Sequence, residues 1–97
     1  MSVVTYTKIR KYLPLGKVVM TACASELLSG QDIIAALSRH KRGDWGEVSE
    51  ADQRANNSAL RHSGRILSDY TGADGTKFWI ITEADRSYTT VLLPDEY

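Results

Sequence analysis

The stretch at residues 78–97, FWIITEADRSYTTVLLPDEY, decides the fold because two β-rich runs flank a short polar segment. The runs, residues 78–82 and 88–93, are rich in aromatic and β-branched side chains, which favour strands. The segment between them, EADR at residues 83–86, has the composition of a turn. The stretch therefore predicts a hairpin. Its charged end is either an ordinary bend with an ion pair between Glu83 and Arg86 or a positioned site.

Residues 65–71 predict a further strand just before this hairpin. The connecting GADG at residues 72–75 suits a type I turn with Gly75 in the left-handed position. That turn fixes the register and aligns the apolar side chains. It places Tyr70, Phe78 and Val91 in one row, with Ile66, Ile80 and Leu93 on the same face.

The opposite face of this three-stranded sheet is also apolar. It carries Leu67, Trp79, Ile81 and Tyr88, although a sheet backed by helices on one side should be polar on the other. Something must cover these side chains, because a monomer rarely exposes such a patch. The candidates are the N-terminal arm, the helix at residues 50–61, a second subunit or another protein.

The first half of the chain predicts a short strand followed by helices. Residues 17–20 form the strand candidate, and Thr21, Ser29 and Ser49 are N-cap residues for helices at 22–28, 31–40 and from 50 to about 61. The predicted fold class is α+β: a short N-terminal strand, two to three helices, then a three-stranded antiparallel meander at the C-terminus. Residues 1–15 form a basic N-terminal arm, in which 2–9 are either an edge strand or a loose extension, and 16–97 form a single α+β domain.

Composition limits the class of protein. The chain has 97 residues, 42% of them hydrophobic and 25% charged, as expected of one ordinary globular domain. Its single cysteine, Cys23, excludes an internal disulfide. We find no apolar run long enough to span a bilayer and no signal-peptide pattern. We therefore expect a cytoplasmic protein.

The sequence offers little catalytic chemistry. His40, His62, Cys23 and Asp44 are scattered without metal-ligand spacing, so we expect neither a metal nor a cofactor. Cys23 lies near a predicted helix N-terminus, which would lower its pKa and make it a candidate nucleophile, but a small side chain in an alanine-rich turn is the commoner role. Trp45, between two glycines, either fills the gap between the helices at 31–40 and 50–61 or anchors a partner.

Charge is distributed unevenly along the chain. Residues 1–42 hold seven Lys or Arg and two acids, a balance of +5, whereas residues 43–97 hold five and ten, a balance of −5. The two halves either neutralise each other on packing or leave a basic surface for nucleic acid. The residues of that surface would be Lys8, Arg10, Lys11, Lys17, Arg39, Lys41 and Arg42.

Two resemblances bear on function. The motifs GDWG at 43–46, RILSDY at 65–70 and WIITEADRSYTTVLLPDEY at 79–97 resemble a family of small uncharacterised bacterial proteins, often labelled plasmid-related and carried on mobile elements. The resemblance covers residues 16–97 and implies a bacterial, mobile-element context without an established activity. More weakly, the order of elements is similar to that of RelE-type toxin ribonucleases. In this chain the basic and aromatic residues of such a ribonuclease site would be Arg65, Lys77, Arg86 and Tyr88. The chain is neutral, however, and lacks the surplus of positive charge expected of a protein that acts on RNA.

These observations favour a non-enzymatic interaction module. It would self-associate or bind a protein partner through the meander, using Trp79, Ile81, Tyr88, Leu67 and Trp45. Nucleic-acid binding through the basic residues is the first alternative, and a RelE-like ribonuclease is the second.

Overall fold

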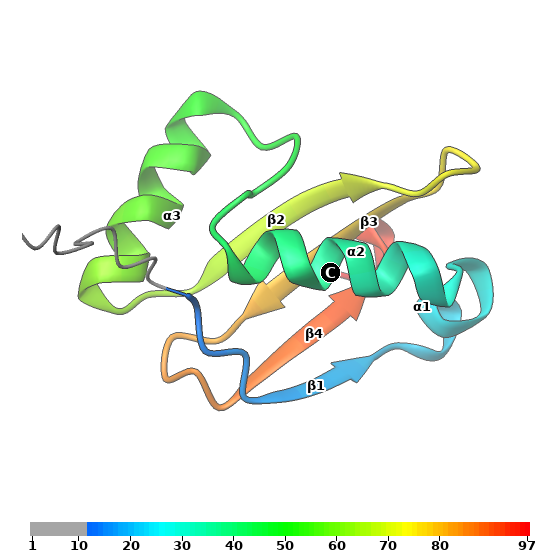
Figure 1. Cartoon of the computed structure of the whole chain (residues 1–97), viewed down its shortest axis with the longest axis horizontal. Coiled ribbons are helices and arrows are strands. Elements are labelled where there is room, and N and C mark those ends of the chain that lie inside the picture. The colour runs from blue at the N-terminus through cyan, green and yellow to red at the C-terminus, as the bar shows by residue number, and fades with distance from the viewer. Residues whose placement is uncertain (1–11) are drawn as a thin grey trace, which may run out of the picture.

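The computed structural model describes residues 12–97 and has an α+β fold with three helices and a four-stranded mixed sheet (Figure 1). The elements, in chain order, are β1 (Lys17–Met20), α1 (Ala22–Leu27), α2 (Gly30–Lys41), α3 (Glu50–His62), β2 (Ile66–Thr71), β3 (Lys77–Thr82), β4 (Tyr88–Leu92) and a short 3-10 helix η1 (Pro94–Glu96). All three predicted caps form: the hydroxyls of Thr21, Ser29 and Ser49 accept the amide protons of Ala24, Asp32 and Asp52. Residues 2–9 lie outside the described part of the chain.

The sheet differs from the prediction. It has four strands in the order β1-β4-β3-β2, because β1 pairs in parallel with β4. The sheet is therefore mixed, not a separate three-stranded antiparallel one. Parallel pairing depends on the return path of the chain through the three helices, which no local pattern specifies.

The register is confirmed for one hairpin and wrong for the other. Tyr70 lies opposite Phe78 as predicted, and Gly75 adopts the expected left-handed conformation with φ 92°. Val91, however, lies opposite Ile80, not Phe78. The shift is two residues, so every side chain keeps its predicted face.

Two hydrophobic clusters make the core. The larger lies between α1, α2 and the sheet, and it is formed by Ala24, Leu28, Ile33, Ala36, Tyr70, Phe78, Ile80 and Val91. The smaller joins Leu13, Trp45 and Ile66 to side chains of α3. Leu13, which the sequence places in the N-terminal arm, is fully buried there, and its amide donates to the carbonyl of Lys41 at 2.9 Å.

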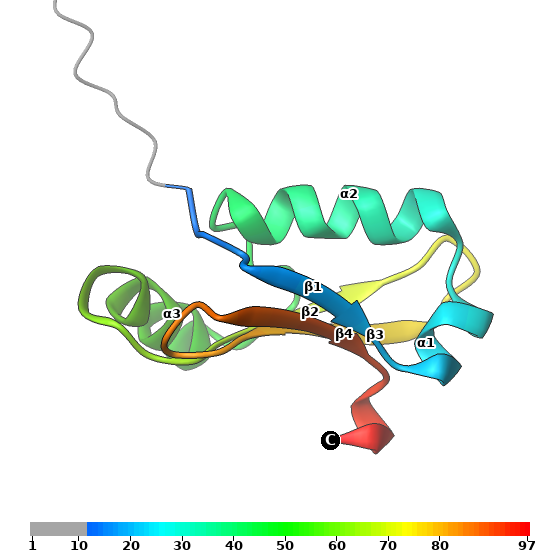
Figure 2. The same cartoon turned by 90° about the horizontal axis from the view of Figure 1, so that it is seen from below.

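The face away from α2 is partly covered by the C-terminus. Figure 2 shows α2 on one side of the sheet and the C-terminal segment on the other. The Tyr97 ring lies 5.6 Å from that of Trp79, edge to face, and Arg65 donates to the Tyr97 hydroxyl. Tyr97 thus covers part of Trp79, a role for which the sequence suggested the N-terminal arm, the helix at residues 50–61 or a partner.

The free edge of β2 is closed by backbone and side-chain hydrogen bonds. The Asn56 side chain donates to the Leu67 carbonyl at 2.8 Å and accepts the Leu67 amide at 3.3 Å. Two residues along, the Asp69 amide donates to the Trp45 carbonyl at 3.1 Å, and the Glu47 amide donates to the Asp69 carbonyl at 2.8 Å. Asn56 is a poor helix former, and this contact explains its place in α3.

Closing the β2 edge leads to the first prediction. Asn56→Ala leaves two backbone groups of Leu67 without their partners and should lower the free energy of unfolding by about 2–3 kcal/mol. Asn56→Asp keeps the acceptor but sets a carboxylate against the Leu67 carbonyl, so it should not restore stability. Urea unfolding followed by circular dichroism measures both.

The matched control is Gln53→Ala, an exposed position in the same helix, for which we expect a change within about 0.5 kcal/mol. Equal stabilities for Asn56→Ala and Gln53→Ala would show that the Asn56 contact does not hold the edge.

Candidate functional site

The outer edge of β1 is open within residues 12–97. The Lys17 amide donates to the carbonyl of Ser87, just before β4, and the Thr21 amide donates to the carbonyl of Val91 in β4, so alternate residues of the parallel ladder face β4. The amides and carbonyls of Val18 and Met20 must then point away from the sheet. Both side chains are 41% exposed. An apolar edge strand with free backbone groups is a template for pairing with another chain.

More apolar surface adjoins this edge. Asp32 bonds the Ala73 amide in the β2–β3 turn, so its side of α2 faces β2. Ile34 lies on the other side of the helix, away from β2, and is 70% exposed. Leu27 of α1, which follows β1 directly, is also exposed. The edge is thus an apolar strip with backbone donors and acceptors.

The two ends of β1 carry opposite charges. Lys17 is exposed at the start of the strand. At its end, the Thr21 hydroxyl donates to the Glu96 carboxylate at 2.7 Å, and the Leu93 amide donates to the same carboxylate at 2.8 Å. These bonds, the Leu93 amide first, lower the pKa of Glu96 and hold a negative charge beside Thr21. The same carboxylate raises the pKa of Cys23, contrary to the prediction from its position near a helix start.

The residues predicted to bind a partner fall into two groups. Trp45 and Ile81 are buried, with 1% and 2% exposure, so neither lies at the surface. For Trp45 this agrees with the other expectation, that it fills the gap between two helices, because its ring lies against His40 of α2 and Asn57 of α3. Trp45 fills the second core cluster, where its indole donates to Asn57 at 2.9 Å. Leu67 and Trp79 are half-buried, and Trp79 is in contact with Tyr97. Only Tyr88 is exposed, and it lies directly opposite Lys17 of β1.

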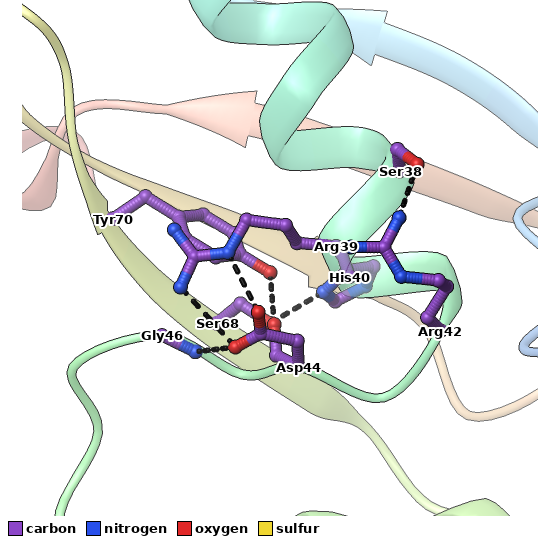
Figure 3. A network of polar contacts seen from close by, with 8 residues as sticks. All are labelled: Ser38, Arg39, His40, Arg42, Asp44, Gly46, Ser68 and Tyr70. Carbon is purple, nitrogen blue, oxygen red and sulfur yellow. Dashed lines mark hydrogen bonds and ion pairs between the residues drawn. The ribbon is translucent and has the colours of Figure 1, made fainter.

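The predicted basic surface is only partly assembled. Lys8, Arg10 and Lys11 lie outside the described residues. The Arg39 guanidinium pairs with Asp44 at 2.8 Å and lies over the Tyr70 ring (Figure 3). Arg42 donates to Ser38 at 2.7 Å, and Lys41 lies 5.9 Å from the Tyr12 ring centroid. The basic side chains at the end of α2 are therefore engaged in contacts within the chain, and the carboxylate of Asp44 offsets the charge of Arg39.

The three basic residues that the ribonuclease resemblance points to, Arg65, Lys77 and Arg86, are engaged in contacts within the chain. Arg86, with φ 61°, donates to the Ala59, Gly64 and Glu83 carbonyls. Lys77 lies 2.9 Å from both Glu47 and Asp69. The charged end of the opening hairpin is thus a clamp between the hairpin and the end of α3. The ion pair predicted between Glu83 and Arg86 is replaced by a pairing of Glu83 with Arg65.

A buried polar chain fixes α2 on the sheet, and sequence reasoning missed it. His40 is fully buried, with Nδ1 2.6 Å from the Ser68 hydroxyl and Nε2 2.8 Å from the Thr82 hydroxyl. The chain continues from Thr82 to Thr89 at 2.7 Å and from Thr89 to the Leu15 carbonyl at 2.7 Å. Ser68, Thr82 and Thr89 all project to the inner face of adjoining strands, and this pattern could have been found in the sequence. The predicted register of β3 and β4 was wrong by two residues, so it did not place Thr82 opposite Thr89.

The direction of this chain follows from its end. A carbonyl only accepts, so Thr89 donates to Leu15, Thr82 donates to Thr89, and the Nε2–H of His40 donates to Thr82. Nδ1 then accepts from Ser68. This arrangement satisfies a neutral imidazole. Burial first, and the charge of Arg86 second, lower the pKa of His40 to about 4.

Other chemistry is sparse in the part of the chain described. Residues 12–97 contain no group of three or more His, Cys, Asp or Glu side chains placed to hold a metal ion. Nor does any helix among them have the length and apolar character needed to cross a membrane. Comparisons with protein-family models, curated proteins and solved structures found no match. The resemblance to plasmid-related proteins therefore stays a prediction.

His40 makes stability depend on pH. Its pKa is about 4 in the folded state and about 6.5 when unfolded, so below pH 6.5 the unfolded chain binds the extra proton. Stability should fall as the pH drops from about 6.5 to 4, by up to about 3 kcal/mol. Urea unfolding at a series of pH values measures this loss.

His40→Gln keeps a polar side chain but cannot titrate, so the part of the pH dependence due to His40 should disappear. His62→Gln, at an exposed site in α3, is the matched control and should retain it. A pH profile of His40→Gln that matches that of the unmodified chain would contradict the assignment.

Proposed function

We propose that this chain is a non-enzymatic interaction module that binds an extended polypeptide segment by adding it to the sheet at β1. The observation that carries the proposal is the contrast between the two sheet edges. The β2 edge is closed by Asn56 and by residues 45–47, whereas Val18 and Met20 present outward backbone groups beside exposed apolar side chains.

Strand addition suits this surface physically. Each main-chain hydrogen bond contributes a net ~0.5–1.5 kcal/mol, and side chains above and below the strand provide specificity. Val18 and Met20 project towards the α2 side, because their β4 neighbours Thr89 and Val91 are buried on that side. Lys17 and Val19 project to the other side, where Tyr88 is the neighbour of Lys17. A bound strand would therefore meet apolar surface on both faces.

This proposal moves the predicted partner surface. The sequence favoured the outer face of the meander, but Trp45 and Ile81 are buried and Tyr97 packs against Trp79. Tyr88 is the member of that set that remains exposed, and it lies beside β1. The interaction role is retained, and its centre shifts from the middle of the sheet to its edge.

The alternatives have less support. Nucleic-acid binding would use the basic residues at the end of α2, but the carboxylate of Asp44 offsets the charge of Arg39. A ribonuclease would need cations free to meet phosphate. Lys77 is shared between two carboxylates, and Arg86 is shared among three carbonyls.

A defined peptide tests the proposal. A lysine-flanked peptide of alternating threonine and valine should bind weakly, because it offers a strand without a matched sequence. In an NMR titration, the amide signals of Val18 and Met20 should shift, and those of Leu67 and Asp69 on the closed edge should not. The same peptide with N-methylated backbone amides cannot pair and should cause no shift. Absence of shifts at millimolar peptide, or equal shifts at both edges, would refute strand addition at β1.

A further inference from the structure

We infer that the strand that β1 binds is β1 of a second copy of this chain, in an antiparallel, two-fold symmetric pair. The inference rests on the proposed function and names its partner. Figure 1 shows β1 along one margin of the sheet, with α3 beyond the opposite margin. A two-fold axis across β1 would join two four-stranded sheets into one continuous sheet.

The backbone selects the register of this pair. Only the groups of Val18 and Met20 point outward, so both are used when Val18 pairs with Met20 of the second copy and Met20 pairs with its Val18. A shift of this register by two residues, which keeps the same backbone groups pointing outward, is blocked in both directions. It would set Met20 against Gly16, which has φ 62° and leaves the extended conformation, or Val18 against Ala22, which begins α1.

The charges support the same register. It places Lys17 directly opposite Thr21 of the second copy, on the face where Val19 also projects. The Thr21 hydroxyl holds the Glu96 carboxylate at 2.7 Å, so each Lys17 ammonium meets a carboxylate across the axis. The symmetric pair makes this contact twice. A parallel pairing would lack the two-fold symmetry, and it would place Lys17 at the opposite end of the pair from the Glu96 carboxylate of the second copy.

The apolar side chains complete the contact. Val18 and Met20, each 41% exposed, would lie opposite each other twice on the α2 side. A four-residue strand supplies a contact far smaller than the roughly 800 Å² per partner of a standard interface. The dimer should therefore be weak, with a dissociation constant in the micromolar to millimolar range.

Sedimentation over this concentration range measures the dimer. Lys17→Glu should weaken it about tenfold, because two attractions become repulsions. Adding Glu96→Lys in the same chain reverses both charges and should restore it. Arg54→Glu makes the same charge change on exposed α3, away from β1, and should change the dissociation constant less than about twofold.

The register has its own test. Val19 faces Val19 of the second copy at the axis, in a non-hydrogen-bonded pair whose side chains lie close together. In a Cys23→Ser background, Val19→Cys should form a covalent dimer with an added thiol oxidant faster than Arg54→Cys. Position 54 is the more exposed of the two, so random collision would give the opposite order, and that order would overturn the register.

The outcomes separate the two proposals. A chain that stays monomeric at millimolar concentration, yet binds the threonine–valine peptide at Val18 and Met20, overturns the second-copy inference and leaves strand addition standing. A monomer that does not bind the peptide overturns both. A monomer that binds it only after residues 1–11 are deleted assigns the edge to the chain's own arm and also overturns the inference.

Discussion

The backbone groups along an edge strand must find partners, and this requirement organises the whole structure. At the β2 edge, Asn56 and residues 45–47 provide them. That contact holds α3 beside the sheet and draws the loop into place, and the second core cluster forms around Trp45 as a result. Gly46 is required there because an added Cβ would lie 2.1 Å from the Asp69 carbonyl oxygen. At the β1 edge, no group within residues 12–97 plays this part, and the surface that remains is the one to which we assign function.

Inside the fold, the hydrogen-bonded chain through His40 provides partners for buried polar groups. It links α2 to β2, β3 and β4 and ends on the Leu15 carbonyl, just before β1. A buried polar chain of this kind contributes little net energy when complete and costs much when broken. Its role is to fix the position of α2 across the strands. The position of β1 at the margin, beside β4, depends on the same link.

Local patterns in the sequence predicted the elements well, and long-range pairing poorly. Thr21, Ser29 and Ser49 identified the helix starts because capping is a contact between near neighbours. Residues 72–75 fixed one hairpin register for the same reason. The second register was two residues out, since residues 83–86 do not dictate a loop geometry. The parallel pairing of β1 and the cover that Tyr97 gives Trp79 join segments far apart in the chain, which composition cannot reveal. The expectation that Ile81 lies at a free surface follows from these gaps, because the chain itself covers much of the apolar face.

Within residues 12–97 one sheet edge is closed and the other open, and native-state hydrogen exchange on the dilute, monomeric protein distinguishes the two edges amide by amide. We expect the Leu67 and Asp69 amides to be protected, because Asn56 and Trp45 accept their protons. The Val18 and Met20 amides should exchange almost as fast as those of an unstructured peptide, while Val19 between them is protected by β4. Strong protection of Val18 and Met20 in the monomer, or free exchange at Leu67 and Asp69, would contradict the account.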